Sequence, residues 1–129
     1  HDGVVIQFTG DGLMASFGTP IDSDAPERAA IAACHGLLAE AQVSGFSIRI
    51  GLAAGTVASG SIGSSSRQAF TVYGDTVNRA ARLEAHGKML GRAVLMDAAV
   101  AGHAGDGLER FDGQELKGLA GKVDVFALG

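Results

Sequence analysis

The chain has 129 residues, of which 47% are hydrophobic and 19% charged, and its formal net charge is −4. These values predict one globular domain with a core of its own and exclude a disordered chain. A net negative charge without basic runs argues against a nucleic-acid binder or a contact with anionic membranes. Cys34 is the only cysteine, which excludes an internal disulfide and, together with the lack of a signal peptide or a long apolar run, predicts a cytoplasmic domain.

Hydrophobic periodicity and turn residues divide the chain into helices and strands. Apolar residues recur at helical spacing around Cys34, where we expect a buried structural thiol, and they alternate with polar residues around Ile50. In chain order we expect strands at 4–8 and 13–17, a helix at 26–43, strands at 46–52, 55–62 and 69–73, a helix at 75–86, a strand at 93–96, a helix at 98–104, and strands at 108–116 and 123–128. This order predicts an α+β fold with helices packed on a mainly antiparallel sheet.

Cap and turn residues set the expected ends of several elements. Residues 22–24 offer three side chains that can cap the first long helix, and Asp97 can cap the last short one. Gly87 is expected to end the helix that begins at Asp75. The glycine and serine run at 63–66 is expected to be an exposed loop.

The segment Tyr73–Glu84 is the most informative part of the chain. It predicts a strand that ends in a glycine turn and then a helix that carries Asn78 and Arg82 four residues apart, on one face. An arginine fork suits phosphate oxygens, and an asparagine amide can orient a hydroxyl. Opposite these groups we expect an apolar face of Val77, Ala80 and Ala81. The arrangement is typical of a nucleotide site, although helical arginines are more often ordinary surface residues.

Two further side chains suit phosphate or metal chemistry, and each also suits an ordinary turn. Asp11 lies between two glycines at the tip of the first hairpin, where a carboxylate can bind Mg²⁺ or simply belong to the turn. Lys117 lies in a glycine-rich turn, where it can meet terminal phosphates as a point charge or remain solvated. The four histidines do not follow metal-ligand spacing, and we treat them as ordinary residues.

Five blocks of sequence, taken in order, closely resemble class III nucleotidyl (adenylate/guanylate) cyclases of bacterial type. The blocks are Phe8–Phe17, Arg49–Leu52, Gly55–Gly63, Gly74–Glu84 and Leu116–Gly118. They span nearly all of the chain. The resemblance implies a ferredoxin-like α+β catalytic domain that works as a homodimer, with composite sites built from both chains. It implies conversion of a nucleoside triphosphate into a 3′,5′-cyclic monophosphate and pyrophosphate, assisted by two Mg²⁺ or Mn²⁺ ions.

The same resemblance assigns roles to the candidate residues. Asp11 matches a metal-binding aspartate of the family, and Asn78 matches the asparagine that positions the ribose. Arg82 matches the arginine that stabilises the transition state at the α-phosphate, and Lys117 matches the lysine on the terminal phosphates. These roles agree with the chemistry of the residue types themselves.

The chain departs from the family at three places. Gln7 stands where adenylate-specific members have Lys and guanylate-specific members have Glu, and Thr71 stands at the partner position, usually Asp or Cys. Both side chains can donate and accept, so they specify the purine weakly. The family's other metal-binding aspartate lies on a strand upstream of His1. We therefore expect residues 1–129 to be a cyclase domain that lacks its first strand and first metal-binding Asp.

Three functions remain open from the sequence. The favoured one is an adenylate cyclase, because bacterial-type members of the family usually make cyclic AMP. The second is a guanylate cyclase. The third is a non-catalytic cyclase-like module that dimerises or senses nucleotide. The missing aspartate and Gln7 favour this third function. It is opposed by the presence of four expected site residues, Asp11, Asn78, Arg82 and Lys117.

Overall fold

The computed structural model describes residues 3–9, 12–19, 21–64 and 67–128, and the backbone alone for residues 7–9, 61–64 and 67–71. Its elements are β1 (Val4–Thr9), β2 (Gly12–Ser16), α1 (Pro26–Ser44), β3 (Ile50–Leu52), β4 (Ala58–Ser64), β5 (Arg67–Tyr73), α2 (Asp75–Leu90), β6 (Val94–Met96), α3 (Ala98–Ala101), β7 (Leu108–Gln114) and β8 (Val123–Leu128). This succession of strands and helices confirms the predicted α+β class.

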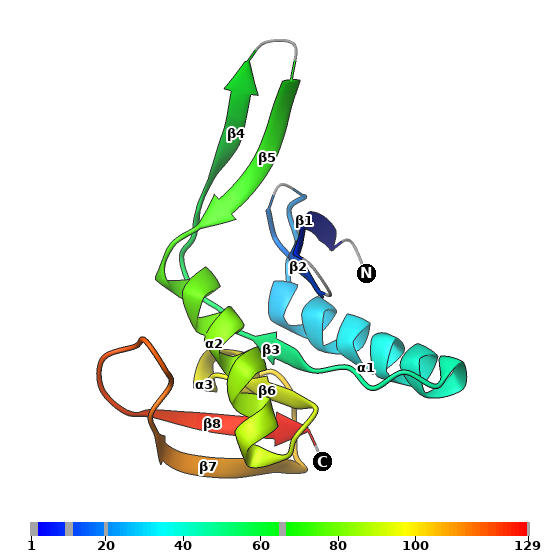
Figure 1. Ribbon diagram of the computed structural model, residues 1–129, viewed down its shortest axis with the longest axis vertical. Coiled ribbons are helices and arrows are strands. Elements are labelled where there is room, and N and C mark those ends of the chain that lie inside the picture. The colour runs from blue at the N-terminus through cyan, green and yellow to red at the C-terminus, as the bar shows by residue number, and fades with distance from the viewer. Residues whose placement is uncertain (1–2, 10–11, 20, 65–66, 129) are drawn as a thin grey trace.

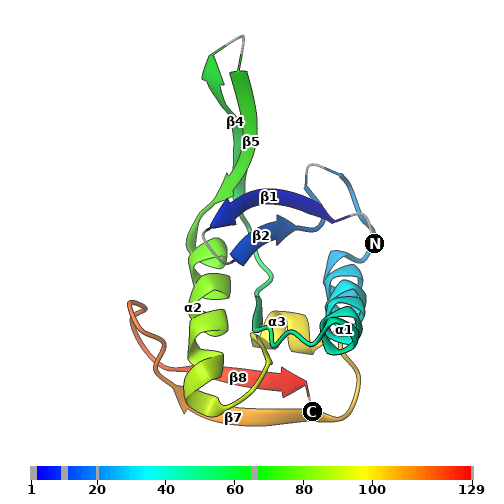
Figure 2. The same ribbon diagram turned by 45° about the vertical axis from the view of Figure 1, so that its right-hand side comes forward.

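A four-stranded sheet in the order β3-β6-β8-β7 forms the centre of the fold. Strands β3 and β6 are parallel, whereas β8 pairs antiparallel with both β6 and β7. The hairpins β1–β2 and β4–β5 form two separate antiparallel sheets. Figure 1 shows the β4–β5 hairpin extending away from the body of the protein, and Figure 2 shows the β1–β2 hairpin above α1 and α2.

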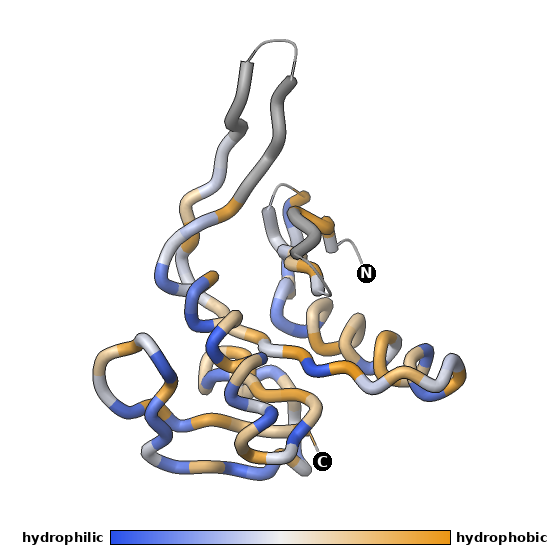
Figure 3. Tube along the Cα trace, viewed as in Figure 1, coloured by the Kyte–Doolittle hydropathy of each residue, from blue (hydrophilic) through white to orange (hydrophobic). Residues whose placement is uncertain are grey.

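Different helices cover the two faces of the central sheet. Side chains of a strand point alternately to opposite faces, and β6 follows this rule with three buried residues. Val94 and Met96 pack with Cys34 of α1, and Leu95 packs with Leu83 of α2. Figure 3 shows that β7, at the edge of the sheet, is mostly hydrophilic. The central strands β6 and β8 are therefore buried between α2 on one side and α1 with α3 on the other.

Helix α1 confirms one expectation and contradicts another. Cys34 is buried, and burial raises the pKa of its thiol to about 11, so the thiol is protonated and unreactive at neutral pH. The cap predicted at residues 22–24 is wrong, because the helix begins after Ala25 without a side-chain cap. The hydroxyl of Ser23 instead accepts a hydrogen bond from the Ala25 amide, 3.3 Å away.

Some strand limits also differ from prediction. Strand β3 does not extend back to Phe46, which is 71% exposed, because its parallel partner β6 has only three residues. The loop predicted at 63–66 is wrong in part, since Gly63 and Ser64 belong to β4 and pair with β5. Strand β7 ends at Gln114 rather than two residues later.

The predicted end of α2 at Gly87 is wrong, and the reason is a close backbone contact. Helix α2 continues to Leu90 and ends at Gly91, which has the left-handed φ of 67°. Gly87 is buried inside the helix, and a Cβ atom placed on it would lie 2.7 Å from the carbonyl oxygen of Arg92. The glycine allows the chain to turn back closely toward β6.

A second glycine sets the distance between α2 and the sheet. A Cβ atom on Gly51 of β3 would lie 2.1 Å from the carbonyl oxygen of Ala80 and 2.5 Å from the amide nitrogen of Glu84. Any other residue at this position collides with helix backbone, which cannot move aside as a flexible side chain can.

No helix in the described part of the chain has the length and apolarity needed to cross a membrane.

We predict that Gly51→Ala lowers the free energy of unfolding by about 3 kcal/mol, because α2 must shift to admit the methyl group. The matched control is Gly36→Ala, since Gly36 lies in α1 with nothing within 4 Å of its Cβ position. That change should be neutral or stabilise by about 0.5–1 kcal/mol. Urea denaturation measures both effects, and equal stabilities of the two variants would contradict the close packing at Gly51.

Candidate active site

Asn78 and Arg82 lie on one exposed stretch of α2, one helical turn apart, as predicted. Gly74, with a φ of 131°, turns the chain from β5 into the helix. The Thr76 hydroxyl donates a 3.0 Å hydrogen bond to the carbonyl of Thr56 and ties the first turn to the preceding loop. Part of the predicted apolar face is wrong, because Ala81 is exposed and the helix buries Leu83 instead.

The loop of residues 115–122 between β7 and β8, here called the lysine loop, brings Lys117 toward Arg82. The Leu119 amide donates a 3.1 Å hydrogen bond to the Leu116 carbonyl, which closes a turn with Lys117 and Gly118 at its corners. Gly118 has a φ of 83°, as the third residue of a type II turn requires. A Cβ atom on Gly118 would lie 3.3 Å from the Arg82 guanidinium. The guanidinium therefore lies against the turn that displays Lys117.

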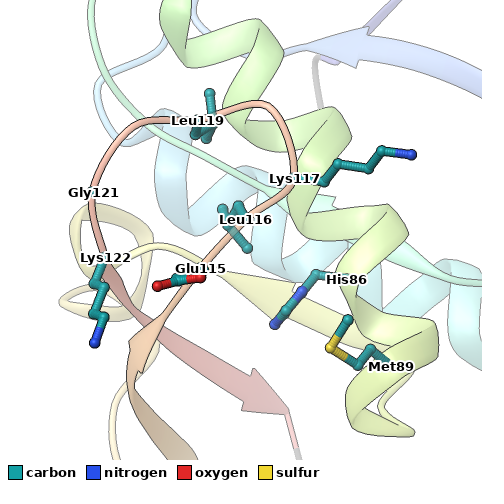
Figure 4. A pocket seen from close by; sticks show the side chains of 8 residues that line it. All are labelled: His86, Met89, Glu115, Leu116, Lys117, Leu119, Gly121 and Lys122. Carbon is teal, nitrogen blue, oxygen red and sulfur yellow. The ribbon is translucent and has the colours of Figure 1, made fainter.

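The side chain of Lys117 leaves the loop on the side of α2. Figure 4 shows it extending past the helix, while Glu115 and Lys122 project elsewhere. A pocket of about 440 Å³ lies between α2 and the lysine loop, and it is lined by Leu116 and Leu119 among others. Leu116 is buried with Leu83 in the core, so the apolar residue anchors the loop and the cation beside it remains exposed.

A charged pair that sequence reasoning missed fixes the first half of α2. Arg79 donates from Nε to Asp97 at 2.9 Å and from Nη2 to the Ala54 carbonyl at 3.2 Å. Asp97 also accepts from the amides of Ala54 at 3.3 Å and Val100 at 3.0 Å, the latter confirming its predicted role as a helix cap. The side chains are only 27% and 12% exposed. Asp97 thus joins α2, α3 and the loop after β3.

A buried histidine provides another contact that the sequence did not single out. His86 is 7% exposed, and its Nε2 donates to Oε1 of Gln114 at 3.0 Å. The contact joins α2 to the end of β7, just before the lysine loop. The two residues are 28 positions apart in sequence, and no local pattern relates them.

Three candidate residues have side chains outside the described part of the structure. Asp11 lies outside the described residues altogether, and only the backbones of Gln7 in β1 and Thr71 in β5 are described. Strands β1 and β5 lie near one another, an arrangement that suits two residues acting on one base. Within the described ranges, no three His, Cys, Asp or Glu side chains gather in a metal-binding group. Metal binding through Asp11 therefore stays a prediction.

Comparison with known proteins identifies the family of this chain. The sequence model of the adenylate and guanylate cyclase catalytic domain matches residues 1–128. Adenylate cyclase 1 of Rhizobium meliloti (strain 1021) is 38% identical over 119 residues, which cover 82% of this chain and 17% of that protein. An uncharacterized protein of Mycobacterium tuberculosis (strain ATCC 25618 / H37Rv) is 41% identical over 86 residues, 64% of this chain and 16% of that protein.

Solved structures share the fold. A bacterial light-regulated adenylyl cyclase superposes with a TM-score of 0.79 at 27% identity, over 99% of this chain and 39% of that one. The guanylate cyclase domain of a Catenaria anguillulae protein in complex with GTP gives a TM-score of 0.80 at 22% identity, over 98% of this chain and 72% of that one. Because the family model matches residues 1–128, the chain belongs to the adenylate and guanylate cyclase catalytic domain family. It spans about a fifth or less of the curated relatives' length.

We predict that Arg79→Met lowers the free energy of unfolding by about 2–3 kcal/mol, because it leaves the Asp97 carboxylate mostly buried without its cation. Arg49→Met is the matched control, since the Arg49–Glu84 pair is 3.7 Å apart with both side chains 44% exposed. Loss of that exposed pair should cost less than about 1 kcal/mol. Chemical denaturation of both variants measures the difference, and a control loss as large as that of Arg79→Met would contradict it.

Proposed function

We propose that this domain converts ATP into 3′,5′-cyclic AMP and pyrophosphate. The observation that carries the proposal is the packing of the Arg82 guanidinium against Gly118. The guanidinium lies 3.3 Å from the point that a Cβ atom on Gly118 would occupy. This contact gathers a guanidinium from α2 and an ammonium from the lysine loop on one exposed face. Two cations on one face suit a substrate whose negative charge is spread along three phosphates.

Each residue has a distinct proposed role on this face. Asn78 orients the ribose through its amide, one turn before Arg82 on the same helix. Arg82 donates to the α-phosphate oxygens and stabilises the transition state in which the bond to pyrophosphate breaks. Lys117 holds the terminal phosphates as a point charge. By comparison with single oxyanion donors in other enzymes, Arg82 supplies roughly 3 kcal/mol of transition-state stabilisation.

Divalent ions and a second chain belong to the same proposal. Asp11 supplies a hard carboxylate oxygen of the kind that Mg²⁺ or Mn²⁺ prefers. When bound, two such ions would neutralise charge on the attacking and leaving oxygens. We propose a homodimer in which each site draws on both chains, so that Asp11 of one chain serves the Arg82 face of the other. The proposed place of action is the cytoplasm, where ATP is abundant.

The preference for ATP rests on relatives whose names state an adenylate cyclase. These are the Rhizobium meliloti protein at 38% identity and the light-regulated bacterial enzyme at 27% identity. Gln7 and Thr71 are neutral groups that can donate or accept, so they give the purine no strong preference by themselves. A guanylate cyclase is the alternative, and direct competition between ATP and GTP separates the two.

We predict that Arg82→Ala lowers kcat about 100-fold and changes the affinity for ATP much less, because the guanidinium acts mainly in the transition state. Pyrophosphate release from ATP with Mg²⁺ or Mn²⁺ measures kcat in the full-length protein. Arg28→Ala is the control, since Arg28 is exposed on α1, whereas the proposed catalytic residues Asn78 and Arg82 lie on α2. Unchanged turnover in Arg82→Ala would favour the non-catalytic nucleotide-sensing module instead.

We predict that Gln7→Lys raises the ratio of ATP to GTP turnover several-fold. A lysine ammonium only donates, so at the N1 edge it favours adenine, whose N1 accepts, over guanine, whose N1 carries a hydrogen, whereas the glutamine amide offers both a donor and an acceptor. The measurement is kcat/KM for ATP and GTP side by side in the wild type and the variant. A ratio that does not move would remove Gln7 from the base-binding site.

A further inference from the structure

We propose that His86 is a positioning residue, which holds the lysine loop in register with α2 so that Lys117 stands beside Arg82. The inference rests on the proposed function, because it concerns the lysine assigned there to the terminal phosphates. His86 is buried and acts through Gln114 rather than through the substrate.

The first step is the position of His86 on its helix. It follows Arg82 by four residues, just as Arg82 follows Asn78, and residues at this interval lie in one row along a helix. The row meets the lysine loop and its base at two places. Arg82 lies against Gly118 near the tip, and His86 hydrogen-bonds to Gln114 at the base.

The second step is the way in which β7 presents Gln114. The pairing of β7 with β8 shifts register between Phe111 and Gln114, and Gly113 has a φ of 60°. Such a bulge re-aims the side chain that follows it. The Gly113 amide donates a 3.1 Å hydrogen bond to Asp124 of β8, which fixes the bulge.

The third step is the orientation of the Gln114 amide. Its Nε2 donates a 3.2 Å hydrogen bond to the carbonyl of Asp112, so its Oε1 faces His86. The glutamine is therefore an acceptor prepared for one donor, and His86 Nε2 is that donor. Removal of the donor would leave an oriented, half-buried acceptor without a partner.

The last step compares what the other contacts of the loop can do. Leu116 is 3% exposed and packs with Leu83, which holds the loop against the core. Apolar burial is not directional, whereas a hydrogen bond depends on distance and angle. The His86–Gln114 bond therefore fixes where the loop lies along α2, three residues before Lys117.

The experiment compares two polar substitutions. His86→Gln retains a donor near the Nε2 position, while His86→Asn is too short to reach Gln114. The probes are α,β-methylene-ATP, which cannot release pyrophosphate, and AMP, both bound to the full-length protein with Mg²⁺. We expect His86→Asn to weaken binding of the triphosphate about three- to tenfold, the range for one lost hydrogen bond. Binding of AMP should remain unchanged, and His86→Gln should behave like the wild type.

A double-mutant cycle ties the effect to the lysine. In a Lys117→Ala background, His86→Asn should change triphosphate affinity less than about twofold, because the group that it positions is gone. His35→Asn is the histidine control, since His35 is exposed on α1. Equal weakening for AMP and the triphosphate, an undiminished effect without Lys117, or no difference between Asn and Gln at position 86 would overturn the positioning role. If the wild-type protein bound neither α,β-methylene-ATP nor GTP, that result would instead overturn the proposed function.

Discussion

The close approach of α2 to β3 at Gly51 is the constraint on which the candidate site depends. The helix backbone that meets this glycine runs from Ala80 to Glu84, so the contact brackets Arg82. A helix held by side chains alone can slide by fractions of an ångström as those side chains change rotamer, but backbone packed on a Cα atom cannot. Gly51 thus sets the height of Arg82 above the sheet, and the side chains around it set the rotation of the helix.

Two kinds of polar contact complete the placement of α2, and they differ in strength. The Arg79–Asp97 pair is largely withdrawn from water and satisfied by backbone groups as well, so loss of Arg79 leaves a mostly buried carboxylate without its cation. The Arg49–Glu84 pair is exposed and longer, and contributes little. Rotation of the helix is therefore controlled near its first turns, close to Asn78, and again at His86.

The sequence was sufficient to predict what local patterns determine. The order of elements, the shared face of Asn78 and Arg82, the burial of Cys34 and the cap by Asp97 all follow from spacing and residue type, and the structure confirms them. Other features depend on contacts between distant segments. From the sequence alone, Gly87 predicts a helix end. Only the structure shows that the carbonyl of Arg92 lies close to it, which explains the glycine inside the helix. The His86–Gln114 contact likewise depends on a bulge in another strand.

Gln114 also illustrates why membership of the cyclase family leaves the purine undecided. A glutamine amide has a donor and an acceptor, and a neighbouring group determines which of them is presented. For Gln114 the Asp112 carbonyl takes the amide nitrogen, so the oxygen alone faces His86. In the proposed base site, the amide of Gln7 offers the same two options. Under that proposal, a neighbouring group that takes one end of the Gln7 amide decides whether adenine or guanine is favoured, whereas a lysine at position 7 would have no such choice.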